Sequence, residues 1–439
     1  MLNTTAGRHT PYGLTCASMA RRYFGTDGVR GIAGEFLTVD LVERLGRAAV
    51  LWRGAGRVFV GRDTRASGIE FEAALAEGIA SAGATAILGG VLPTPAVALG
   101  VLDLGAVITA SHNPPEYNGV KFFDAEGSKL TDAEEEQIEA LLDAPAAPQR
   151  GGIERAGNAG AAYVEEVLER FGADLSGLRI VVDCANGAYS ALAPVAFERL
   201  GAEVSSIGAS PDGSNINSGC GATDTALLQR TVTERGAMLG VAFDGDGDRI
   251  VAVDEQGGVV DGDGIVAILA LDLRVERVAV TQMTNLGFHA LMRQHGIAVD
   301  TTEVGDRYVL EALRREGAIL GGEQSGHVIY LRDHVTGDGL TAALLLCAAL
   351  RGRPLSEAAG VFTRYAQRKE NVPVVSKELT PAVLAAVAEI NAELDGSGRV
   401  LVRPSGTEPI VRVLVEAENA EVAERACVRI AALVESELG

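Results

Sequence analysis

The sequence predicts an α/β protein made of three similar units and a smaller C-terminal α+β unit. Short apolar runs that end in polar, glycine-rich loops alternate with helical segments through most of the 439 residues. This alternation is typical of βαβ units and a largely parallel sheet. After about residue 366 the order changes to strand, helix, two strands and helix, which favours a small two-layer module. Ligands bind beyond the carboxyl ends of strands in open α/β sheets, so the loops at the strand ends are the expected functional regions.

In the first unit, apolar periodicity predicts alternating helices and strands. Helices are expected at 39–53, 69–82 and 131–143, strands at 57–61, 85–89 and 106–109, and a loop at 91–96. Thr131 and Glu134 form a capping-box pattern that marks the start of the third helix. The Ala-, Pro- and Gly-rich segment 144–160 is interpreted as a connection to the next domain.

The same alternation continues through the rest of the chain. Strands are expected at 178–183, 202–207, 238–243, 250–254, 277–283, 299–304, 317–321, 399–402 and 410–416, and helices at 161–171, 191–200, 264–274, 287–295, 308–316, 339–350, 380–394 and 419–437. These elements predict four domains, at 19–160, 161–261, 262–365 and 366–439. Residues 1–18 lack a core-forming pattern, so we expect an unstructured extension, with Met19 as the natural start.

The composition excludes several classes of partner. The net charge is −21, which argues against binding to nucleic acid or to an anionic membrane surface and leaves a small-molecule substrate. The longest apolar run, 341–350, is far shorter than the ~20 residues that a membrane span requires. The five cysteines are scattered and include no CxxC pair, which indicates neither a disulfide framework nor a zinc site. We therefore expect a reducing, cytoplasmic setting.

The segment AVITASHNPPEYNGVKFF, 106–123, is the region around which the chain is organised. Its apolar run indicates a buried strand, and Pro114 and Pro115 prevent a regular continuation. Ser111 is thus expected on a stiff loop beyond the strand, where a hydroxyl can act as a nucleophile or a phosphate carrier. An ordinary surface turn is the alternative interpretation of the same residues.

The sequence DGDGDR brings three carboxylates, Asp244, Asp246 and Asp248, close together after the strand 238–243. The glycines allow a tight backbone, so the three can converge on one hard cation, and without a cation they would repel one another. An EF-hand is rejected because Arg249 occupies the position that requires glycine and a strand follows. An acidic β-turn is the other alternative. With Arg249 adjacent, Mg²⁺ beside a phosphoryl group is the preferred interpretation.

Three further loops carry polar groups on glycine-rich turns. GGEQSGH places Glu323, Ser325 and His327 at a strand end, where they suit recognition of hydroxyl groups. RPSGTEP is interpreted as a phosphate site, with donors at Arg403, Ser405, Gly406 and Thr407. A helix-capping box from Ser405 is the alternative there, but the following residues alternate as a strand does. YFGTDGVRG presents Arg30 as an anion ligand or as part of a plain N-terminal turn.

Together, TASHNPP, DGDGDR, GEQSGH and RPSGTEP resemble the α-D-phosphohexomutase family, from about residue 20 to the C-terminus. YFGTDGVRG and GEQSGH resemble the branch that interconverts glucosamine 6-phosphate and glucosamine 1-phosphate for amino-sugar nucleotide and peptidoglycan precursor synthesis. The resemblance implies four domains around a central cleft. It also implies a phosphoserine at Ser111, and one Mg²⁺ on Asp244, Asp246, Asp248 and that phosphoserine.

The resemblance further implies a glucosamine 1,6-bisphosphate intermediate, which also serves as activator. Arg30, Lys121 and Arg249 are expected to neutralise the transferring group. Lys121, taken to lie on the exit of the serine loop, is a candidate general base or a structural ion pair, and His327 is a candidate acid or base. His112 is expected to be structural, because neighbouring side chains on an extended chain point apart.

Other functions remain open from the sequence alone. A phosphoglucomutase or phosphomannomutase would use the same chemistry, and a phosphosugar-binding protein without turnover would keep the same loops. The intact serine, aspartates and phosphate loop argue against the last. The sequence does not define the oligomeric state, so a homodimer stays open.

Overall fold

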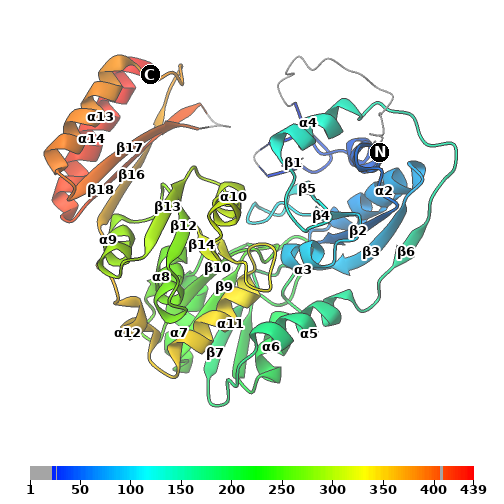
Figure 1. The fold of residues 1–439 in the computed structure, drawn as a ribbon, viewed down its shortest axis with the longest axis horizontal. Coiled ribbons are helices and arrows are strands. Elements are labelled where there is room, and N and C mark those ends of the chain that lie inside the picture. The colour runs from blue at the N-terminus through cyan, green and yellow to red at the C-terminus, as the bar shows by residue number, and fades with distance from the viewer. Residues whose placement is uncertain (1–21, 26, 406–408) are drawn as a thin grey trace, which may run out of the picture.

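The computed structural model describes residues 22–439 except Thr26 and residues 406–408. The expectations for residues 1–18, for Met19, and for Gly406 and Thr407 lie outside this described part. Four units, called units 1 to 4 below, lie along an arc with unit 1 and unit 4 at its two ends (Figure 1). They cover residues 22–155, 159–260, 262–359 and 366–438.

Unit 1 is a mixed six-stranded sheet with helices packed on it. The sheet order is β1 (Val29–Ile32), β5 (Tyr117–Phe123), β4 (Leu104–Ile108), β2 (Arg57–Arg62), β3 (Thr85–Val91) and β6 (Ile153–Arg155), and the helices are α1 (Val39–Arg53), α2 (Gly68–Ser81), α3 (Thr94–Leu99) and α4 (Asp132–Ala140). The predicted capping box of Thr131 and Glu134 is present at the start of α4.

Units 2 and 3 are smaller sheets with the same kind of helical cover. Unit 2 has the order β11 (Val259–Val260), β10 (Ile250–Asp254), β9 (Leu239–Phe243), β7 (Arg179–Asp183) and β8 (Glu203–Ile207), with α5 (Ala159–Phe171), α6 (Ala193–Arg199) and α7 (Ala226–Arg235). Unit 3 has the order β13 (Ala298–Thr302), β12 (Arg277–Thr281), β14 (Leu320–Gly322) and β15 (Val328–Tyr330), with α8 (Gly262–Asp272), α9 (Leu286–Gln294), α10 (Asp306–Glu316), α11 (Gly339–Leu350) and α12 (Leu355–Ala359).

Units 1, 2 and 3 share one topology in their central strands. The order β5-β4-β2-β3 in unit 1 corresponds to β10-β9-β7-β8 in unit 2 and to β15-β14-β12-β13 in unit 3. In each unit the last three strands of that order pair in parallel, and the first pairs antiparallel with its neighbour. The expected repeat is therefore real, and antiparallel pairing is confined to one side of each of these three sheets.

This repeat places three of the predicted functional loops at equivalent positions. The serine loop connects β4 to β5, the aspartate loop connects β9 to β10, and the 323–327 loop connects β14 to β15. Each is the turn of an antiparallel hairpin at the carboxyl end of a parallel strand. The same structural position therefore supplies three different sets of side chains.

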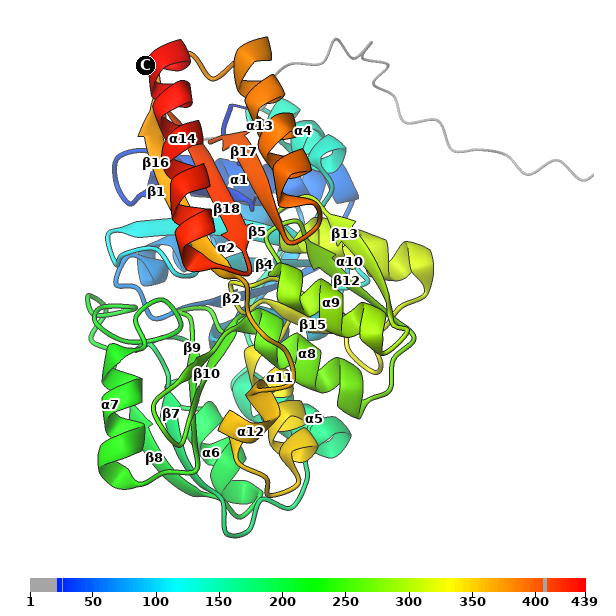
Figure 2. The ribbon, with the colours of Figure 1, turned by 90° about the vertical axis from the view of Figure 1, so that its left-hand side faces the viewer.

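Unit 4 is a separate α+β layer pair. Its sheet has the antiparallel order β16 (Ala366–Pro373), β18 (Ile410–Ala417) and β17 (Gly398–Pro404), and α13 (Pro381–Leu394) and α14 (Ala420–Leu438) cover one face (Figure 2). Its apolar core is its own, whereas one continuous core joins buried residues of units 1, 2 and 3. The fourth predicted loop, 403–409, also connects two strands of a hairpin, β17 and β18.

Several local expectations were wrong. The segment predicted as a loop at 91–96 contains the start of α3, because Pro95 is tolerated in the first turn of a helix. The exit of the serine loop is strand β5, and Lys121 lies within it. The connection 144–160 contains the short edge strand β6, and the helix α7 was not predicted. Among the described residues, the helices are all too short or too polar to cross a membrane.

Candidate active site

Ser111 lies near the start of the β4–β5 turn and has a left-handed backbone conformation, with a φ of 50°. Its side chain is buried, and its hydroxyl donates to Asp244 Oδ2 at 2.6 Å, from unit 1 to unit 2. Its amide donates to Thr109 Oγ1 at 2.8 Å. A non-glycine residue with positive φ is uncommon and persists only where its surroundings hold it. The serine is thus fixed against the aspartate loop.

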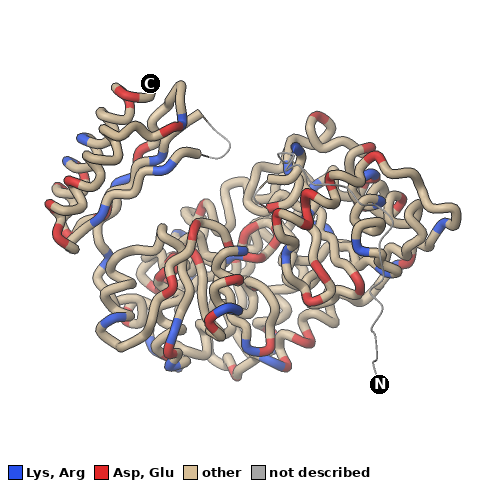
Figure 3. The backbone as a smooth tube through the Cα atoms, turned by 45° about the horizontal axis from the view of Figure 1, so that its top comes forward, with Lys and Arg blue, Asp and Glu red and all other residues tan. Residues whose placement is uncertain are grey.

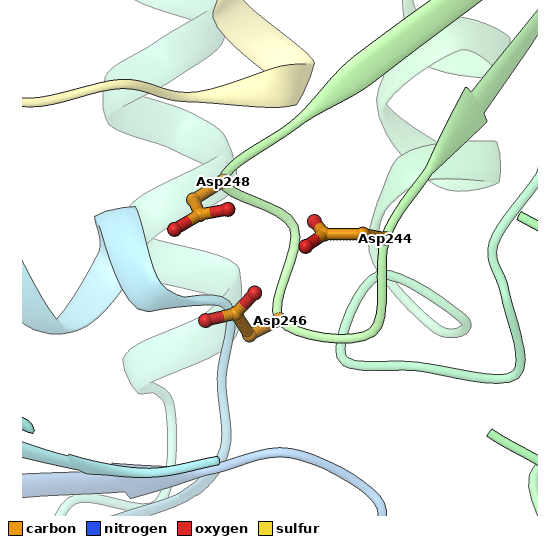
Figure 4. Close-up of side chains that lie close together, drawn as sticks. All are labelled: Asp244, Asp246 and Asp248. Carbon is orange, nitrogen blue, oxygen red and sulfur yellow. The ribbon is translucent and has the colours of Figure 1, made fainter. Parts of the chain in front are cut away.

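The aspartate loop brings its three carboxylates together as the sequence predicted. One oxygen from each of Asp244, Asp246 and Asp248 lies within 4.8 Å of the others, and all three residues are buried. Figure 4 shows the carboxylates turned toward a common space inside the turn between β9 and β10. Gly247 has a φ of 75°, and a Cβ there would lie 2.4 Å from the ring of Tyr189. Glycine at this position is therefore required by the turn.

The three carboxylates do not share one electrostatic environment. Burial, together with the charges of Asp248 and Asp246, raises the pKa of Asp244 well above its ordinary range. Burial opposes ionisation of Asp248 too, but the positive charges of His327 and Lys121 hold the pKa of that carboxyl well below its usual value. A crowded carboxylate cluster of this kind is electrostatically unfavourable without a cation.

A divalent metal fits this cluster. Asp246 Oδ1 and Asp248 Oδ1 are buried and accept no hydrogen bond within the described part of the chain. Buried oxygens of this kind are costly unless a proton donor or a cation satisfies them. Carboxylate oxygens from a flexible turn are also the ligands that Mg²⁺ and Ca²⁺ prefer. The trio can therefore hold a metal, with the hydroxyl of Ser111 at its edge.

Lys121 reaches the trio from strand β5 of unit 1. Its buried ammonium lies 3.0 Å from Asp246 Oδ2, 3.8 Å from Asp248 Oδ2 and 2.9 Å from Asp27 Oδ2. Burial disfavours the charge, but Asp246 and Asp27 outweigh it and raise the pKa of Lys121. In the structure Lys121 is therefore an ion-paired cation, and its carboxylate partners explain why its charge is tolerated in the interior.

A chain of alternating charges extends this contact across units 1 and 3. Asp27 also pairs with Lys129 at 2.8 Å, and Lys129 pairs with Asp306 Oδ2 at 2.6 Å. Asp306 Oδ2 lies 3.4 Å from His327 Nε2, and His327 Nδ1 lies 3.7 Å from Asp248 Oδ1. The charges thus alternate from the aspartate loop through unit 1 and unit 3 and back again. Figure 3 shows acidic and basic residues gathered where these three units meet.

The cations predicted on the loops lie around the serine. Arg30 pairs with Asp27 at 2.7 Å and donates to Asn113 Oδ1 at 3.2 Å, which places it beside the serine loop. Arg249 directly follows the trio, and its amide donates to Asp244 Oδ1 at 3.2 Å. Burial opposes the charge of Arg249, but Asp244 and Asp248 raise its pKa. Arg30 therefore contacts the serine loop, and Arg249 contacts the trio.

His112 was expected to be structural, and the structure brings it nearer to the serine than that implies. Its Nδ1 lies 3.3 Å from Ser111 Oγ, because the left-handed backbone of Ser111 breaks the extended geometry on which the expectation rested. Burial and the charges of Arg249 and Arg30 lower the pKa of His112 to about 4. A neutral imidazole therefore adjoins the serine hydroxyl.

The third and fourth loops differ in how far the structure describes them. Glu323 is buried and accepts from the amide of Gly305 at 3.1 Å, and Ser325 is exposed at the tip of the turn. Ser405 is buried and its carbonyl accepts from Lys377 at 2.8 Å. Strand β18 begins at Ile410, where the capping-box alternative requires a helix, so that alternative is wrong.

Arg403 and Arg412 face each other across the strands β17 and β18. Burial, together with the charge of Arg412, lowers the pKa of Arg403. Figure 3 shows several basic residues along the strands of unit 4. Like charges opposite one another on a sheet are unfavourable, so the pair favours an anion nearby.

Several residues that build the site were not predicted as functional. Asp27, Lys129 and Asp306 complete the alternating charges, and Arg65 and Asn217 hold the serine loop through hydrogen bonds described below. For Arg65 a signal existed, since RDTR places three charged residues directly after a predicted core strand. For the others the contact joins residues far apart in the chain, which local patterns do not reveal.

Comparison with known proteins assigns the chain to a family. Models of the phosphoglucomutase/phosphomannomutase α/β/α domains I, II and III match residues 21–148, 158–258 and 261–365, and the model of the C-terminal domain matches 370–433. The chain belongs to the phosphoglucomutase/phosphomannomutase family. The four matches fall one on each unit, so the family assignment covers nearly all of the described chain.

Similar proteins include enzymes named phosphoglucosamine mutase. The one from Moorella thermoacetica is 49% identical over 429 residues, which cover 92% of this chain and 97% of that protein. The one from Nocardia farcinica is 49% identical over 455 residues, covering 94% and 99%. Among solved structures, a phosphoglucomutase/phosphomannomutase family protein from Burkholderia thailandensis has a TM-score of 0.80 and 25% identity, covering 94% of this chain and 98% of that one.

A more distant relative supports the fold alone. The structure of N-acetylphosphoglucosamine mutase from Aspergillus fumigatus, in complex with GlcNAc-6P and magnesium, has a TM-score of 0.68 at 19% identity. The match covers 94% of this chain and 96% of that one. This chain therefore shares its fold with that protein at low sequence identity.

Proposed function

We propose that the chain is a phosphoglucosamine mutase, an isomerase that interconverts glucosamine 6-phosphate and glucosamine 1-phosphate. One observation carries the proposal: the buried hydroxyl of Ser111 lies 2.6 Å from a carboxylate of a trio that can hold a metal. The relatives that bear this name are up to 49% identical over more than nine-tenths of the chain, which supports the sugar. The product would supply amino-sugar nucleotide and peptidoglycan precursor synthesis.

In the proposed reaction Ser111 carries a phosphoryl group between the two positions of the sugar. The 1-hydroxyl oxygen of glucosamine 6-phosphate attacks the phosphorus of the phosphoserine, and the bond from phosphorus to the serine oxygen breaks. The sugar hydroxyl loses its proton, and the serine oxygen gains a proton. The bound product is glucosamine 1,6-bisphosphate. After this intermediate turns around, the serine oxygen attacks its 6-phosphoryl group, and the bond from phosphorus to the 6-oxygen breaks. The serine proton passes to the 6-oxygen, and glucosamine 1-phosphate leaves.

The cations around Ser111 would neutralise the charge of the transferring group. Phosphoryl transfer depends largely on positioning and on electrostatic stabilisation of the equatorial oxygens. Arg30 contacts the serine loop, and Lys121 and Arg249 contact the trio. Lys121 and His327 each adjoin a carboxylate of the trio, so they are the candidates for exchanging the hydroxyl proton.

Asp244, Asp246 and Asp248 would hold one Mg²⁺ together with the phosphoserine, and the bound ion would supply positive charge to the phosphoryl oxygens. The loop of Glu323 and Ser325 would recognise the sugar hydroxyls. The loop that begins at Arg403 and Ser405, with Gly406 and Thr407, would bind the phosphate that is not reacting.

Replacement of the serine tests the mechanism. We expect Ser111→Ala to lower activity by several orders of magnitude without changing the melting temperature, because the carrier oxygen is lost. Intact-mass measurement should show one phosphoryl group on the wild-type protein and none on the variant. Ser81→Ala, at the end of α2, serves as control and should keep full activity. A Ser111→Ala variant with about a tenth of the wild-type rate would contradict the phosphoserine mechanism.

A phosphoglucomutase or phosphomannomutase is the second candidate, supported by the name of the family model and of the Burkholderia structure. A coupled assay of kcat/KM with glucosamine, glucose and mannose 6-phosphates separates the candidates. We expect the glucosamine substrate to be preferred by at least about tenfold, and equal or reversed preference would favour the second candidate. Absence of turnover with all three substrates would indicate a phosphosugar-binding protein.

A further inference from the structure

Arg65 is fully buried and donates all five of its N–H groups, four of them to backbone carbonyls of the serine loop and its exit. Its Nε donates to Asp63 Oδ2 at 2.9 Å, and its two Nη atoms donate to backbone carbonyl oxygens. These carbonyls belong to Ser111 at 2.9 Å, Asn113 at 2.8 Å, Pro114, and Tyr117 at 2.9 Å. A guanidinium has five donors in a fixed plane, so this site uses its whole capacity.

Asn217 reaches the same carbonyls from unit 2. Its Nδ2 donates to the carbonyl oxygen of Ser111 at 2.8 Å and to that of Asn113 at 3.2 Å. Each of these carbonyls therefore accepts two hydrogen bonds, one from each unit, which fills both of its lone pairs. The opposite side of the amide, Asn217 Oδ1, is buried without a hydrogen-bond partner in the described part of the chain. The unpaired oxygen costs free energy, but the Nδ2 of the same amide provides the two hydrogen bonds between unit 2 and the serine loop.

The two side chains act on the conformation that aims the serine. Ser111 has a left-handed backbone, which an L-amino acid other than glycine adopts only when its neighbours impose it. Fixing the carbonyl of Ser111 fixes its ψ, and the bond from its amide to Thr109 Oγ1 restrains the other side of the residue. The hydroxyl direction toward Asp244 follows from this backbone. Neither Arg65 nor Asn217 contacts the serine hydroxyl in these hydrogen bonds.

We propose that Arg65 and Asn217 are positioning residues for phosphoryl transfer, which together clamp the serine loop and make its aim depend on the seating of unit 2. This inference rests on the proposed function, because it concerns Ser111 as the phosphoryl carrier. Transfer requires the donor oxygen in line with the acceptor, and an error of about 1 Å can cost roughly a hundredfold in rate. Substrate binding involves other loops, so the clamp acts on kcat and leaves KM.

Asn217→Gly is the sharpest test, because glycine keeps the φ of 58° without strain while the whole side chain, with its amide donor, is removed. With glucosamine 6-phosphate, Mg²⁺ and added glucosamine 1,6-bisphosphate, we expect kcat to fall by about tenfold to a hundredfold. KM should stay within about twofold and the melting temperature within about 2 °C. Arg274→Gly is the matched control, since Arg274 is exposed, has a φ of 51° and lies in unit 3.

Arg65→Lys provides a second, independent measurement. Lysine keeps a positive charge beside Asp63 but has three donors on one atom, so it cannot hold four carbonyls. We expect the same loss of kcat, with part of the stability lost as well. Arg44→Lys is its control, since Arg44 bridges the carbonyl of Leu142 and the carboxylate of Asp143 in the same unit. The double variant should lose less than the product of the single losses, because both residues grip the same carbonyls.

The outcomes separate this inference from the proposed function. If Ser111→Ala is inactive while Asn217→Gly keeps kcat within about twofold at an unchanged melting temperature, the clamp is overturned and the mutase mechanism stands. An equal loss in Arg274→Gly, or a loss confined to KM, would also overturn it. If Ser111→Ala remains active, the proposed function itself fails. Should Arg65→Lys not fold, Asn217→Gly decides the question alone.

Discussion

Asp246 carries two duties that its two oxygens divide between them. Oδ2 accepts from Thr94 Oγ1 at 2.7 Å and from Lys121 at 3.0 Å, so it holds unit 1 against unit 2. Oδ1 is buried with no hydrogen-bond partner among the described residues. One atom is thus structural, and the other is left for a cation.

This division gives a prediction for Asp246→Asn. The amide can keep an oxygen toward Thr94 and Lys121, but it removes a negative charge from the trio, so Mg²⁺ affinity and activity should fall together. We expect at least about a tenfold rise in the Mg²⁺ concentration for half-maximal activity. Asp272→Asn, which removes a charge paired with Arg351, should leave that concentration unchanged. Full wild-type activity after dialysis against EDTA would contradict the role of the metal.

At the scale of elements, Asp63, which directly follows β2, and Asp183, which ends β7, have equivalent structural roles. Asp63 Oδ1 accepts from the amide of Arg65, and Asp183 Oδ1 accepts from the amide of Ala185, each two residues further along. Asp183 Oδ2 also accepts from the amide of Gly221 at 2.8 Å. Each carboxylate therefore fastens the loop beyond its own parallel strand.

The burial of Asp183 predicts a pH dependence of stability. Burial raises the pKa of its carboxyl to about 6, above its ordinary value of 3.8. Between these two pH values the carboxyl is protonated in the folded protein and ionised in the unfolded chain. The contribution of Asp183 is thus most favourable below pH 4 and declines as the pH rises through 6. The deficit in melting temperature of Asp183→Asn relative to wild type should therefore be larger at pH 4 than at pH 7, by on the order of a few degrees. A constant difference between the two proteins across this range would contradict the assignment.

The loops were predictable because their chemistry is local in sequence. DGDGDR contains its three carboxylates and its turn glycines within six consecutive residues, so the trio could be inferred without a fold. Strand β5 was missed because Asn118 and Gly119 weaken its strand pattern, although a Cβ at Gly119 would lie 2.6 Å from the carbonyl oxygen of Thr109. Glycine is required at this position because β5 and its neighbours leave no room for a Cβ, and this close approach is visible only in the folded sheet.

At the scale of the whole molecule, the contacts between units could not be predicted. Lys129 and Asp306 are separated by most of two units in sequence, yet they pair at 2.6 Å. Lys121 likewise pairs with Asp246 from another unit. Since such pairs depend on how the sheets stack, hydrophobic periodicity carries no information about them. The sequence therefore predicted the contents of each loop but not the charges that link one loop to the next.

Unit 4 lies at the far end of the arc from unit 1 (Figure 1). The prediction for this unit concerns Arg403. If Arg403 holds the phosphate that is not reacting, it must hold it in both halves of the reaction, so its loss should fall mainly on KM. It must also retain the bisphosphate between the halves, since each escape leaves Ser111 without phosphate.

Arg403→Lys keeps the charge but loses the two-pronged grip of a guanidinium. We expect KM to rise by about tenfold. The progress curves should slow during turnover, and added glucosamine 1,6-bisphosphate should restore the rate. Arg425→Lys, on the exposed side of α14, should behave as wild type. Linear progress curves that do not respond to added bisphosphate would remove this role from the loop.

The separate core of unit 4 has a consequence for how such a gene can recombine. A crossover between the coding regions of units 1 and 2 would take the serine from one parent and the amide of Asn217 from the other, and would divide the continuous core of units 1 to 3. A crossover near residue 366 would exchange a module whose interior is its own, and whose contacts with unit 3 include polar ones, such as the hydrogen bond from Arg399 to the carbonyl oxygen of Thr284 at 2.7 Å. Chimeras made from two relatives should therefore survive exchange of the last module far more often than exchange of the first.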